Sequence, residues 1–588
     1  MSKPTHFLSL ITVLLLSLFF GIVLSAQLLG ATNSYTPTLA ILLGLLLSVA
    51  AFVSLLRSNI LGYAQSTLGR PTATRLPAWL QTALFSTALL LLTLLVLLPL
   101  ARWPFSHISE TLHWDAGIYH LPKAVELYRS GTLWDLSIPF GEFPNGYEAL
   151  LSFTLSLSHA DLLFGSVHAA IALLFFLSLF LLARRLTDLP EGLLALLIVV
   201  LMISGRVTLA YNPWWIFSDL LYTIGKNDLL AGTLTLLALF FAPIGRESPR
   251  PAYHWPALAL VTFLALCTKP YAAYALLPVW LLVFWRESQH TRPALPYKTL
   301  LLATLIVLPG IWWVVRNLIV LGVIFPPEVL EMQQWSILSN LTNPFFYNYL
   351  PRNFVFVLII SGLLLLIGLL RKRLPPWFVA TQWLLLLTFI ATAETAFFRD
   401  TQKPTVIAWR FGIALLSFTF LSLLILLEPL LLRLMRALLR WRPTAPLLGL
   451  LLVGLTIFLI WNDRSLLRYV PENGIVLRDQ FREPVGKNGY HSAYDYLQKN
   501  IRNSVIQVEN GLVYYAYGPG YTNSPTKLQY PWGMAERVPQ LTPQYFLVFE
   551  RPWMGGESGY SPTLDTPEWA QRWELIYEDG EGRLYRRR

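Results

Sequence analysis

Long apolar runs separated by short polar segments occupy most of the first 461 residues. The runs 7–30, 82–101 and 446–461 each hold roughly 16 to 24 mostly apolar residues without a charge, about the length that crosses a bilayer core. Because backbone polar groups must be satisfied internally in lipid, Leu-rich runs of this kind predict helices. Further windows bring the predicted total to about thirteen spans: 38–56, 161–183, 190–204, 228–245, 256–268, 270–285, 299–318, 353–370, 376–393 and 407–432.

Composition supports this interpretation. Hydrophobic residues make up 55% of the 588 residues, charged residues only 13%, and the mean hydropathy is +0.53, which is too apolar for a soluble chain of this length. The predicted fold class is therefore mainly α, a polytopic helical membrane protein. The first run is interpreted as a span rather than a cleaved signal peptide because its apolar core is long, although Ser25 and Ala26 near its end are small.

Basic residues collect in alternate loops, and this asymmetry predicts the orientation of the chain in the plasma membrane. With an odd number of spans, the N-terminus is cytoplasmic, and both the loop 102–148 and everything after Trp461 lie outside. The net charge of +11 follows largely from this bias and requires no nucleic-acid partner. The basic residues of the predicted cytoplasmic loops are Arg57, Arg70, Arg75, Arg184, Arg185, Arg246, Arg250, Arg286, Arg292, Lys298, Arg371, Lys372, Arg373, Arg433, Arg436, Arg440 and Arg442.

After Trp461 the composition becomes mixed and polar, which predicts a small extracytoplasmic α/β domain over 462–588, following a membrane module over 1–461. The pattern predicts a helix over 491–501, strands over 504–509 and 545–550, and a hairpin over 574–586. The position of this domain suggests acceptor recognition as its role. The single cysteine, Cys267, lies in a predicted span, so the chain has no intramolecular disulfide.

The first outward loop, 102–148, is too long for a simple connector. Its segment HWDAGIYHLPKAVEL contains Asp115, and LPKAVELYRSG predicts an interfacial helix that begins near Pro122 and ends at Gly131. Asp115 then lies just ahead of this helix, near the level where the third span leaves the membrane. A structural alternative is that Asp115 caps the loop or the helix.

Basic residues from four separate segments are expected at the same outer level as Asp115. Lys226 precedes Asp228 in GKNDLL (225–230), and Lys269 separates two short apolar segments that read as a hairpin broken before Pro270. Arg316 with Asn317, and Arg410, lie at the outer ends of two further spans. Charges at span ends also serve as snorkelling anchors. Together, however, these residues have the composition of an anion-binding cleft beside a carboxylate.

The order of these motifs resembles a known family. The W-D-x-x-x-Y-H-L-P segment of the first outward loop, the later K-N-D at the start of a span, and W-x-x-R-N-x-x-x-x-G-x-x-x-x-P are similar to polyprenyl-phosphate-sugar glycosyltransferases of the GT-C superfamily. The branch in question contains bacterial protein mannosyltransferases and aminoarabinose transferases. The resemblance extends to the layout of nearly the whole chain, with about thirteen spans, a large first external loop and a soluble external domain.

The resemblance implies a polyprenyl-phosphate-linked sugar as donor and a glycan, lipid or protein acceptor at the outer face of the bilayer. Asp115 is then the general base, and Lys226, Lys269, Arg316 and Arg410 bind the donor phosphate. Residues that line the site are His113, Tyr119, His120, Asp228 and Asn317. The alternatives are a polysaccharide polymerase or ligase, and a flippase or transporter of lipid-linked sugars.

The chain also departs from the family pattern. Ala116 and Gly117 follow Asp115 where a second acid is common, with Glu110 as a substitute, and no cofactor is required by the pattern. A divalent metal held by His113, Asp115 and His120 is a less favoured alternative, because no compact metal motif is present. In FGEFPNGYEALLSF (140–153), Glu142, Asn145 and Glu148 fit either sugar binding or turn formation.

Overall fold

The computed structural model describes most of the helical module and most of the C-terminal domain. The described residues are 3–58, 60–61, 76–101, 115–136, 138, 140–204, 220–221, 224–242, 255–288, 297–325, 352–370, 374–391, 412–440, 449–450, 453–454, 457, 491–509, 511–526, 542–549, 562–579 and 582–588.

Apolar helices occupy the predicted spans within these residues, which confirms the mainly helical class. Six helical segments are long and apolar enough to cross a bilayer, so the chain is a multi-pass membrane protein. The total of about thirteen spans stays a prediction, because 446–461 is described only in part. The helices are α1 (Lys3–Ala31), α2 (Pro37–Arg57), α4 (Ala78–Leu92), α5 (Leu98–Ala101), α8 (Phe164–Leu186), α9 (Glu191–Ser204), α11 (Asp228–Phe241), α12 (Trp255–Thr268), α13 (Pro270–Ser288), α14 (Tyr297–Val307), α15 (Trp312–Leu321), α19 (Arg352–Leu370), α20 (Pro376–Ala391) and α21 (Ile413–Arg440).

Burial separates central helices from peripheral ones. In α8, with the short 3₁₀ turn η5 (Asp161–Leu163) before it, 83% of the apolar window is buried, against 17% in the α14–α15 region. Outward leucines of the peripheral helices, such as Leu46 on α2 and Leu305 on α14, are more than half exposed. Apolar side chains facing outward are what a lipid solvent favours, so α8 lies at the centre of the bundle and α14 at its rim.

The first outward loop contains two helices beside the bundle. The helix predicted in this loop is confirmed as α6 (Leu121–Ser130), with Pro122 in its first turn and Gly131 in the left-handed conformation, φ +72°, at its end, while its interfacial position stays a prediction. It is preceded by a wide π turn, η4 (Ala116–His120). A second helix, α7 (Gly146–Ser158), was not predicted as a separate element, because its apolar pattern is too short for a span.

The C-terminal domain is an α/β unit, as predicted. Its five-stranded sheet has the order β2-β1-β3-β5-β4, in which β1 pairs in parallel with β2 and β3, while β5 pairs antiparallel with β3 and β4. The predicted helix, two strands and hairpin are confirmed, whereas α25, β2 and α26 were missed because they are too short to show a period. The elements are α24 (His491–Asn500), β1 (Val505–Glu509), α25 (Val513–Ala516), β2 (Ser524–Thr526), β3 (Tyr545–Phe549), α26 (Pro567–Arg572), β4 (Trp573–Glu578) and β5 (Gly582–Arg587).

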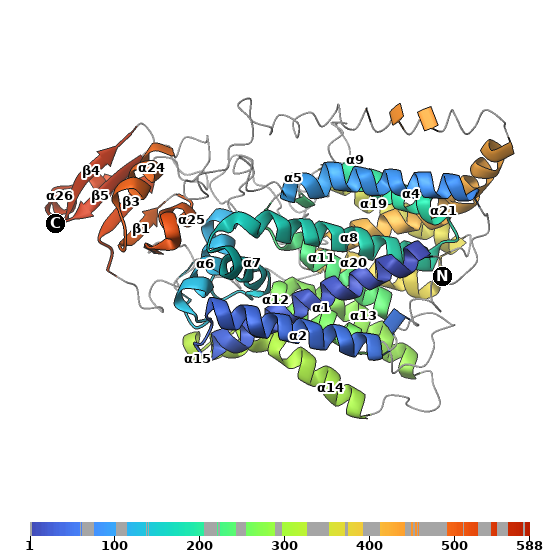
Figure 1. The fold of residues 1–588 in the computed structure, drawn as a ribbon, viewed down its shortest axis with the longest axis horizontal. Coiled ribbons are helices and arrows are strands. Elements are labelled where there is room, and N and C mark those ends of the chain that lie inside the picture. The colour runs from blue at the N-terminus through green and yellow to red at the C-terminus, as the bar shows by residue number, and fades with distance from the viewer. Residues whose placement is uncertain are drawn as a thin grey trace.

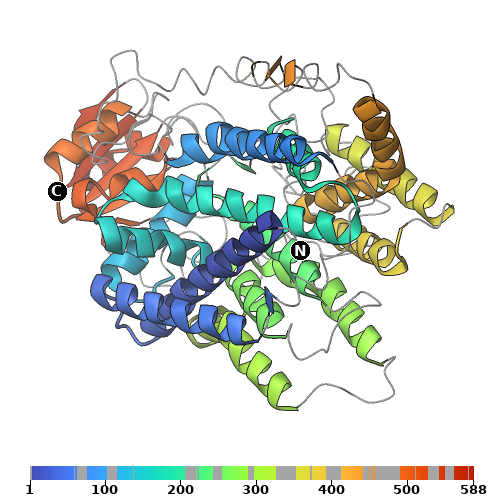
Figure 2. The same ribbon diagram turned by 45° about the vertical axis from the view of Figure 1, so that its right-hand side comes forward.

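The domain lies at one end of the helical bundle, with α25 on the side of α6 and α7 (Figures 1 and 2). The boundary predicted at 461 falls outside the described residues. The loop predicted to face outward and the C-terminal domain therefore lie at the same end of the molecule.

The end of α6 gives a test of the loop's packing. A side chain at Gly131 would be strained by the positive φ, and its Cβ would also lie 2.8 Å from the Tyr35 carbonyl oxygen of the α1–α2 turn. Gly322 has the same φ of +72° with nothing within 4 Å, which makes it a matched control. We expect Gly322→Ala to lose about 1 kcal/mol from backbone strain and Gly131→Ala to lose roughly 1–3 kcal/mol more. Thermal unfolding of the two purified variants measures the difference, and equal midpoints would contradict the close packing at Gly131.

Candidate functional site

Asp115 begins the π turn that leads into α6. The residue is buried, with 8% of its surface exposed, and its side chain makes no capping hydrogen bond to the turn that follows. A helix cap therefore does not explain this carboxylate. Turns of the π type are rare in proteins, and those that occur are often found at functional sites. The local backbone therefore agrees with a specialised role for Asp115.

The K-N-D loop packs directly against the Asp115 segment. Gly225 adopts φ +89°, and a Cβ added there would collide with the side chain of Ala116. The Gly225 N–H donates to the hydroxyl of Tyr147 on α7, at 3.0 Å. Because only glycine allows this backbone approach, the sequence brings Lys226 beside the segment that carries Asp115.

Lys226 differs from its neighbours in having no partner. Its side chain is buried, with 4% of its surface exposed, yet it forms no hydrogen bond or ion pair within the described part of the chain. A positive charge that has no counter-charge among the described residues can pair with an anionic ligand. Lys226 thus has the properties expected of an anion ligand.

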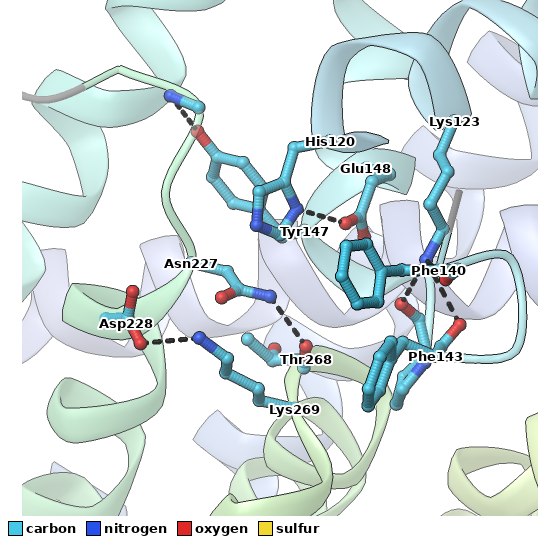
Figure 3. Close-up of polar contacts among 12 residues, drawn as sticks. His120, Lys123, Phe140, Phe143, Tyr147, Glu148, Asn227, Asp228, Thr268 and Lys269 are labelled. Carbon is cyan, nitrogen blue, oxygen red and sulfur yellow. Dashed lines mark hydrogen bonds and ion pairs between the residues drawn. The ribbon is translucent and has the colours of Figure 1, made fainter. Parts of the chain in front are cut away.

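Lys269, the second predicted phosphate ligand, forms an ion pair with Asp228. It occupies the single-residue break between α12 and α13, and its Nζ lies 2.5 Å from Oδ1 of Asp228, the first residue of α11. Beside this pair, Nδ2 of Asn227 donates to the Thr268 carbonyl oxygen at 2.9 Å (Figure 3). The predicted break at Lys269 is confirmed, and these contacts join it to the K-N-D loop.

His120, the last residue of η4, forms a buried pair with Glu148 of α7. Nδ1 of His120 lies 2.5 Å from Oε1 of Glu148. Burial lowers the pKa of His120, while the Glu148 pKa is lowered because Lys123 and His120 outweigh the effect of burial. Neutral His120 therefore donates from Nδ1, which leaves Nε2 as an acceptor on the side of Asn227 (Figure 3).

Electrostatics locate this pair relative to the other site residues. The charges of Glu148, Lys269 and Asp115 all act on His120. Tyr119 packs on the His120 ring at 4.1 Å and on Phe140 at 4.7 Å, between ring centroids. Asp115, His120 and Lys269 thus belong to one neighbourhood, with Tyr119 at its edge.

Lys123, which sequence reasoning missed, binds the loop that leads into α7. Its Nζ donates to the carbonyl oxygens of Phe143 and Pro144 at 3.1 Å and of Phe140 at 3.4 Å (Figure 3). Burial lowers its pKa to about 8. The spacing of three residues from His120 places both on one face of α6, which is the signal that would have found it.

Arg316 and Asn317 also donate hydrogen bonds to this loop. The Arg316 guanidinium donates to the carbonyl oxygens of Leu133 at 3.2 Å and Gly141 at 2.8 Å, and to Oδ1 of Asn317. Nδ2 of Asn317 donates to the Glu142 carbonyl oxygen at 2.7 Å. The guanidinium predicted to bind phosphate is 1% exposed and already donates to main-chain carbonyls, so its position is that of a loop anchor.

Acceptor atoms without partners gather on this loop and its surroundings. Within the described residues, no donor reaches Oε2 of Glu142, Oε2 of Glu148, Oδ1 of Asn145 or Oδ1 of Asn227. Burial raises the pKa of Glu142, while the nearby charges of Lys123 and Arg316 act to lower it. A ligand rich in hydroxyl or other donor groups would satisfy atoms of this kind.

Two of the predicted site residues, His113 and Arg410, lie outside the described residues. The structure brings together Asp115, Tyr119, His120, Lys226, Asp228 and Lys269, with Arg316 and Asn317 beneath the adjoining loop. No group of three or more His, Cys, Asp and Glu side chains suited to a metal occurs in the described ranges, and the metal alternative, which included His113, stays untested.

No protein-family model matches the chain, and no curated protein matches it in sequence. Among solved structures, the chain is similar to ArnT from Cupriavidus metallidurans bound to undecaprenyl phosphate, with 14% identity and a TM-score of 0.49 over 86% of this chain and 97% of that chain. The apo state of the same protein gives a TM-score of 0.46 with the same identity and coverage. Likeness at this level does not assign a function, which must come from the residues of this chain.

The lowered pKa of Lys123 predicts a pH dependence of stability. Its folded-state pKa of about 8 lies below the ordinary value of 10.5 for a lysine, so the unfolded chain binds more protons between these values. The contribution of Lys123 to the free energy of unfolding therefore rises between pH 8 and pH 10.5, by about 1 kcal/mol per pH unit near the centre of this range. We expect the thermal midpoint of the wild type to increase relative to Lys123→Met between pH 8 and pH 9.5. A difference that stays constant or shrinks would contradict the buried, partly discharged ammonium.

Proposed function

We propose that the chain is a GT-C-type glycosyltransferase that moves a sugar from a polyprenyl-phosphate donor to an acceptor hydroxyl at the outer face of the membrane. The observation that carries this proposal is the packing of Gly225 on Ala116. This contact brings together the carboxylate segment at Asp115 and the loop of Lys226, a lysine without a partner among the residues that the structure describes. The motif order of the chain, which resembles that superfamily, supports the same reaction.

The two lysines are the proposed ligands of the donor phosphate. Lys226 supplies a buried positive charge without a partner in the described residues, and Lys269 supplies a second one oriented by Asp228. A phosphate that gains negative charge as its bond to the sugar breaks is stabilised by ammonium groups placed in advance. Arg316 acts in this proposal by anchoring the loop 133–144, and Arg410 keeps its predicted phosphate role.

Asp115 is the proposed general base. The acceptor hydroxyl forms a bond to the anomeric carbon while its proton passes to the Asp115 carboxylate, and the bond from that carbon to the phosphate oxygen breaks with its electron pair. Polyprenyl phosphate leaves as the charged product. An in-line displacement of this kind inverts the anomeric centre.

The unpartnered acceptor oxygens of Glu142, Asn145 and Glu148 are the proposed contacts for sugar hydroxyls. Each hydroxyl donates to an oxygen that otherwise stays buried without a hydrogen bond. Sugar recognition therefore uses the loop that Lys123 and Arg316 hold. His120 and Asn317 position this loop and its neighbours, and Tyr119 lines the site.

In this proposal the helical module, 1–461, spans the plasma membrane with its N-terminus in the cytoplasm. The domain 462–588 and the Asp115 segment face outward, where polyprenyl-phosphate sugars present their head groups. The spanning helices supply the apolar surface along which the polyprenyl chain lies in the bilayer. The alternatives differ in outcome, since a flippase moves the donor intact and a polymerase or ligase extends or transfers a glycan chain.

The base is tested by Asp115→Asn in purified protein reconstituted in lipid with a panel of polyprenyl-phosphate sugars. We expect sugar transfer by the wild type and a loss of kcat of at least about a hundredfold in the variant, because the amide cannot accept the proton. Asp495→Asn on α24 is the matched control and should retain wild-type kcat. Full activity of a folded Asp115→Asn protein would move the base to another group, with Nε2 of His120 the first to examine. Intact donor crossing the bilayer without transfer would favour the flippase.

The phosphate role is tested by Lys226→Met, which keeps the length of the side chain and removes its charge. We expect weaker binding of polyprenyl phosphate, by about tenfold or more, together with an unchanged thermal midpoint because the ammonium group makes no contact in the described residues that the change removes. Lys499→Met on the exposed end of α24 is the control. Unchanged phosphate affinity would show that Lys226 is not a ligand.

A further inference from the structure

Part of the C-terminal domain belongs to the core of the helical module. Val513, Tyr514, Tyr517 and Tyr521 pack within the same apolar cluster as residues of α6, α7 and α8. The domain has its own separate core, formed by residues of α24, β1, β3 and β5. The segment 512–524, here called the docking segment, is therefore the part of the domain that joins it to the bundle.

Polar contacts fix the docking segment to the first outward loop and to η5. The Tyr514 hydroxyl donates to Oδ2 of Asp161 at 2.8 Å. The Tyr517 hydroxyl lies 3.4 Å from the carbonyl oxygen of Pro122, and the Arg129 guanidinium lies over the Tyr517 ring at 5.4 Å from its centroid. These contacts tie the docking segment to both ends of α6.

The closest approach is at Leu512. A Cβ added to Gly117 would lie 2.9 Å from Cδ2 and 3.1 Å from Cβ of Leu512, so the leucine rests directly on the backbone two residues after Asp115. The preceding residue, Ala116, is contacted by Gly225 of the K-N-D loop, which carries Lys226. The backbone that carries the proposed base thus contacts both the donor-phosphate loop and the C-terminal domain.

The conformation of this backbone needs such support. Ala116–His120 forms a π turn, whose wider hydrogen-bonding pattern is less favourable than that of an α-helix. Gly117 adds further conformational freedom within the turn. Neighbouring contacts therefore determine where the Asp115 carboxylate points.

We propose that the docking segment is a positioning element for Asp115: Leu512, held by the Tyr514 and Tyr517 contacts, keeps the π turn in the conformation that directs the carboxylate to the acceptor hydroxyl. This inference rests on the proposed function and assigns the C-terminal domain a direct part in the reaction. General-base catalysis is sensitive to displacements of well under 1 Å, so loss of the contact lowers kcat more than it changes donor binding.

A crosslink tests the contact independently of activity. Gly117→Cys with Leu512→Cys places two Cβ atoms about 3.1 Å apart, within a small adjustment of disulfide geometry. The native Cys267 is buried and does not compete. We expect most of the oxidised, full-length double variant to migrate as a crosslinked species on a non-reducing gel. Gly117→Cys with Leu575→Cys, on the exposed face of β4, should not crosslink. Absence of the first crosslink in folded protein would overturn the inference.

Kinetics of a double-mutant cycle test the positioning role. We expect Gly117→Ala to lower kcat about tenfold or more, with the KM for the donor within about twofold, because the new methyl group displaces the turn from Leu512. Adding Leu512→Ala removes the colliding Cδ atoms and should restore most of the loss, while Leu575→Ala alone leaves kcat unchanged. A Gly117→Ala enzyme with wild-type kcat, or a loss that Leu512→Ala does not relieve, would overturn the inference.

The two proposals fail in different ways. If the wild type transfers no sugar while the cysteine pair crosslinks, the proposed function is wrong and the docking contact stands. If the wild type transfers sugar and the cysteine pair does not crosslink, the glycosyltransferase assignment stands and the positioning role is wrong.

Discussion

Two buried cations, Lys123 and Arg316, donate hydrogen bonds to several carbonyl oxygens of the loop that precedes α7. The chain between Leu133 and Pro144 has little regular structure, yet it lies against the interior of the molecule, where unsatisfied carbonyl groups are costly. Glu142 and Glu148 balance the two positive charges. Glu148 also pairs with His120 and so fixes the orientation of its ring. The same carboxylate thus offsets the charge of Lys123 and positions His120.

Glycines make the close approaches on which the site depends. Gly225 meets Ala116, Gly117 meets Leu512, and a Cβ on Gly146 would lie 2.6 Å from the carbonyl oxygen of Cys267 at the end of α12. Each contact brings a glycine against a residue from a distant part of the chain. A Cβ atom at any of them would force the contacting residue to move.

The sequence predicted the features that depend on local pattern. Apolar runs located the helices, Pro122 and Gly131 located α6, and the charge inside an apolar segment located the break at Lys269. The sequence could not predict which residues contact one another across long separations in the chain. An arginine at a span end suits phosphate and main-chain carbonyls equally well by residue type, and only the fold shows that Arg316 donates to Leu133 and Gly141. Lys226 and Lys269 likewise look the same in sequence, although one is paired with Asp228 and the other has no partner in the described residues.

The contact between Leu512 and Gly117 joins residues that are nearly 400 positions apart in the chain. During synthesis, helices α1 to α21 are translated long before the docking segment. Contacts of such large sequence separation form late, because the intervening chain must first be ordered. The Asp115 segment therefore gains this contact only after the docking segment has been made, so a nascent or truncated chain has its earlier helices in place without the support of Leu512.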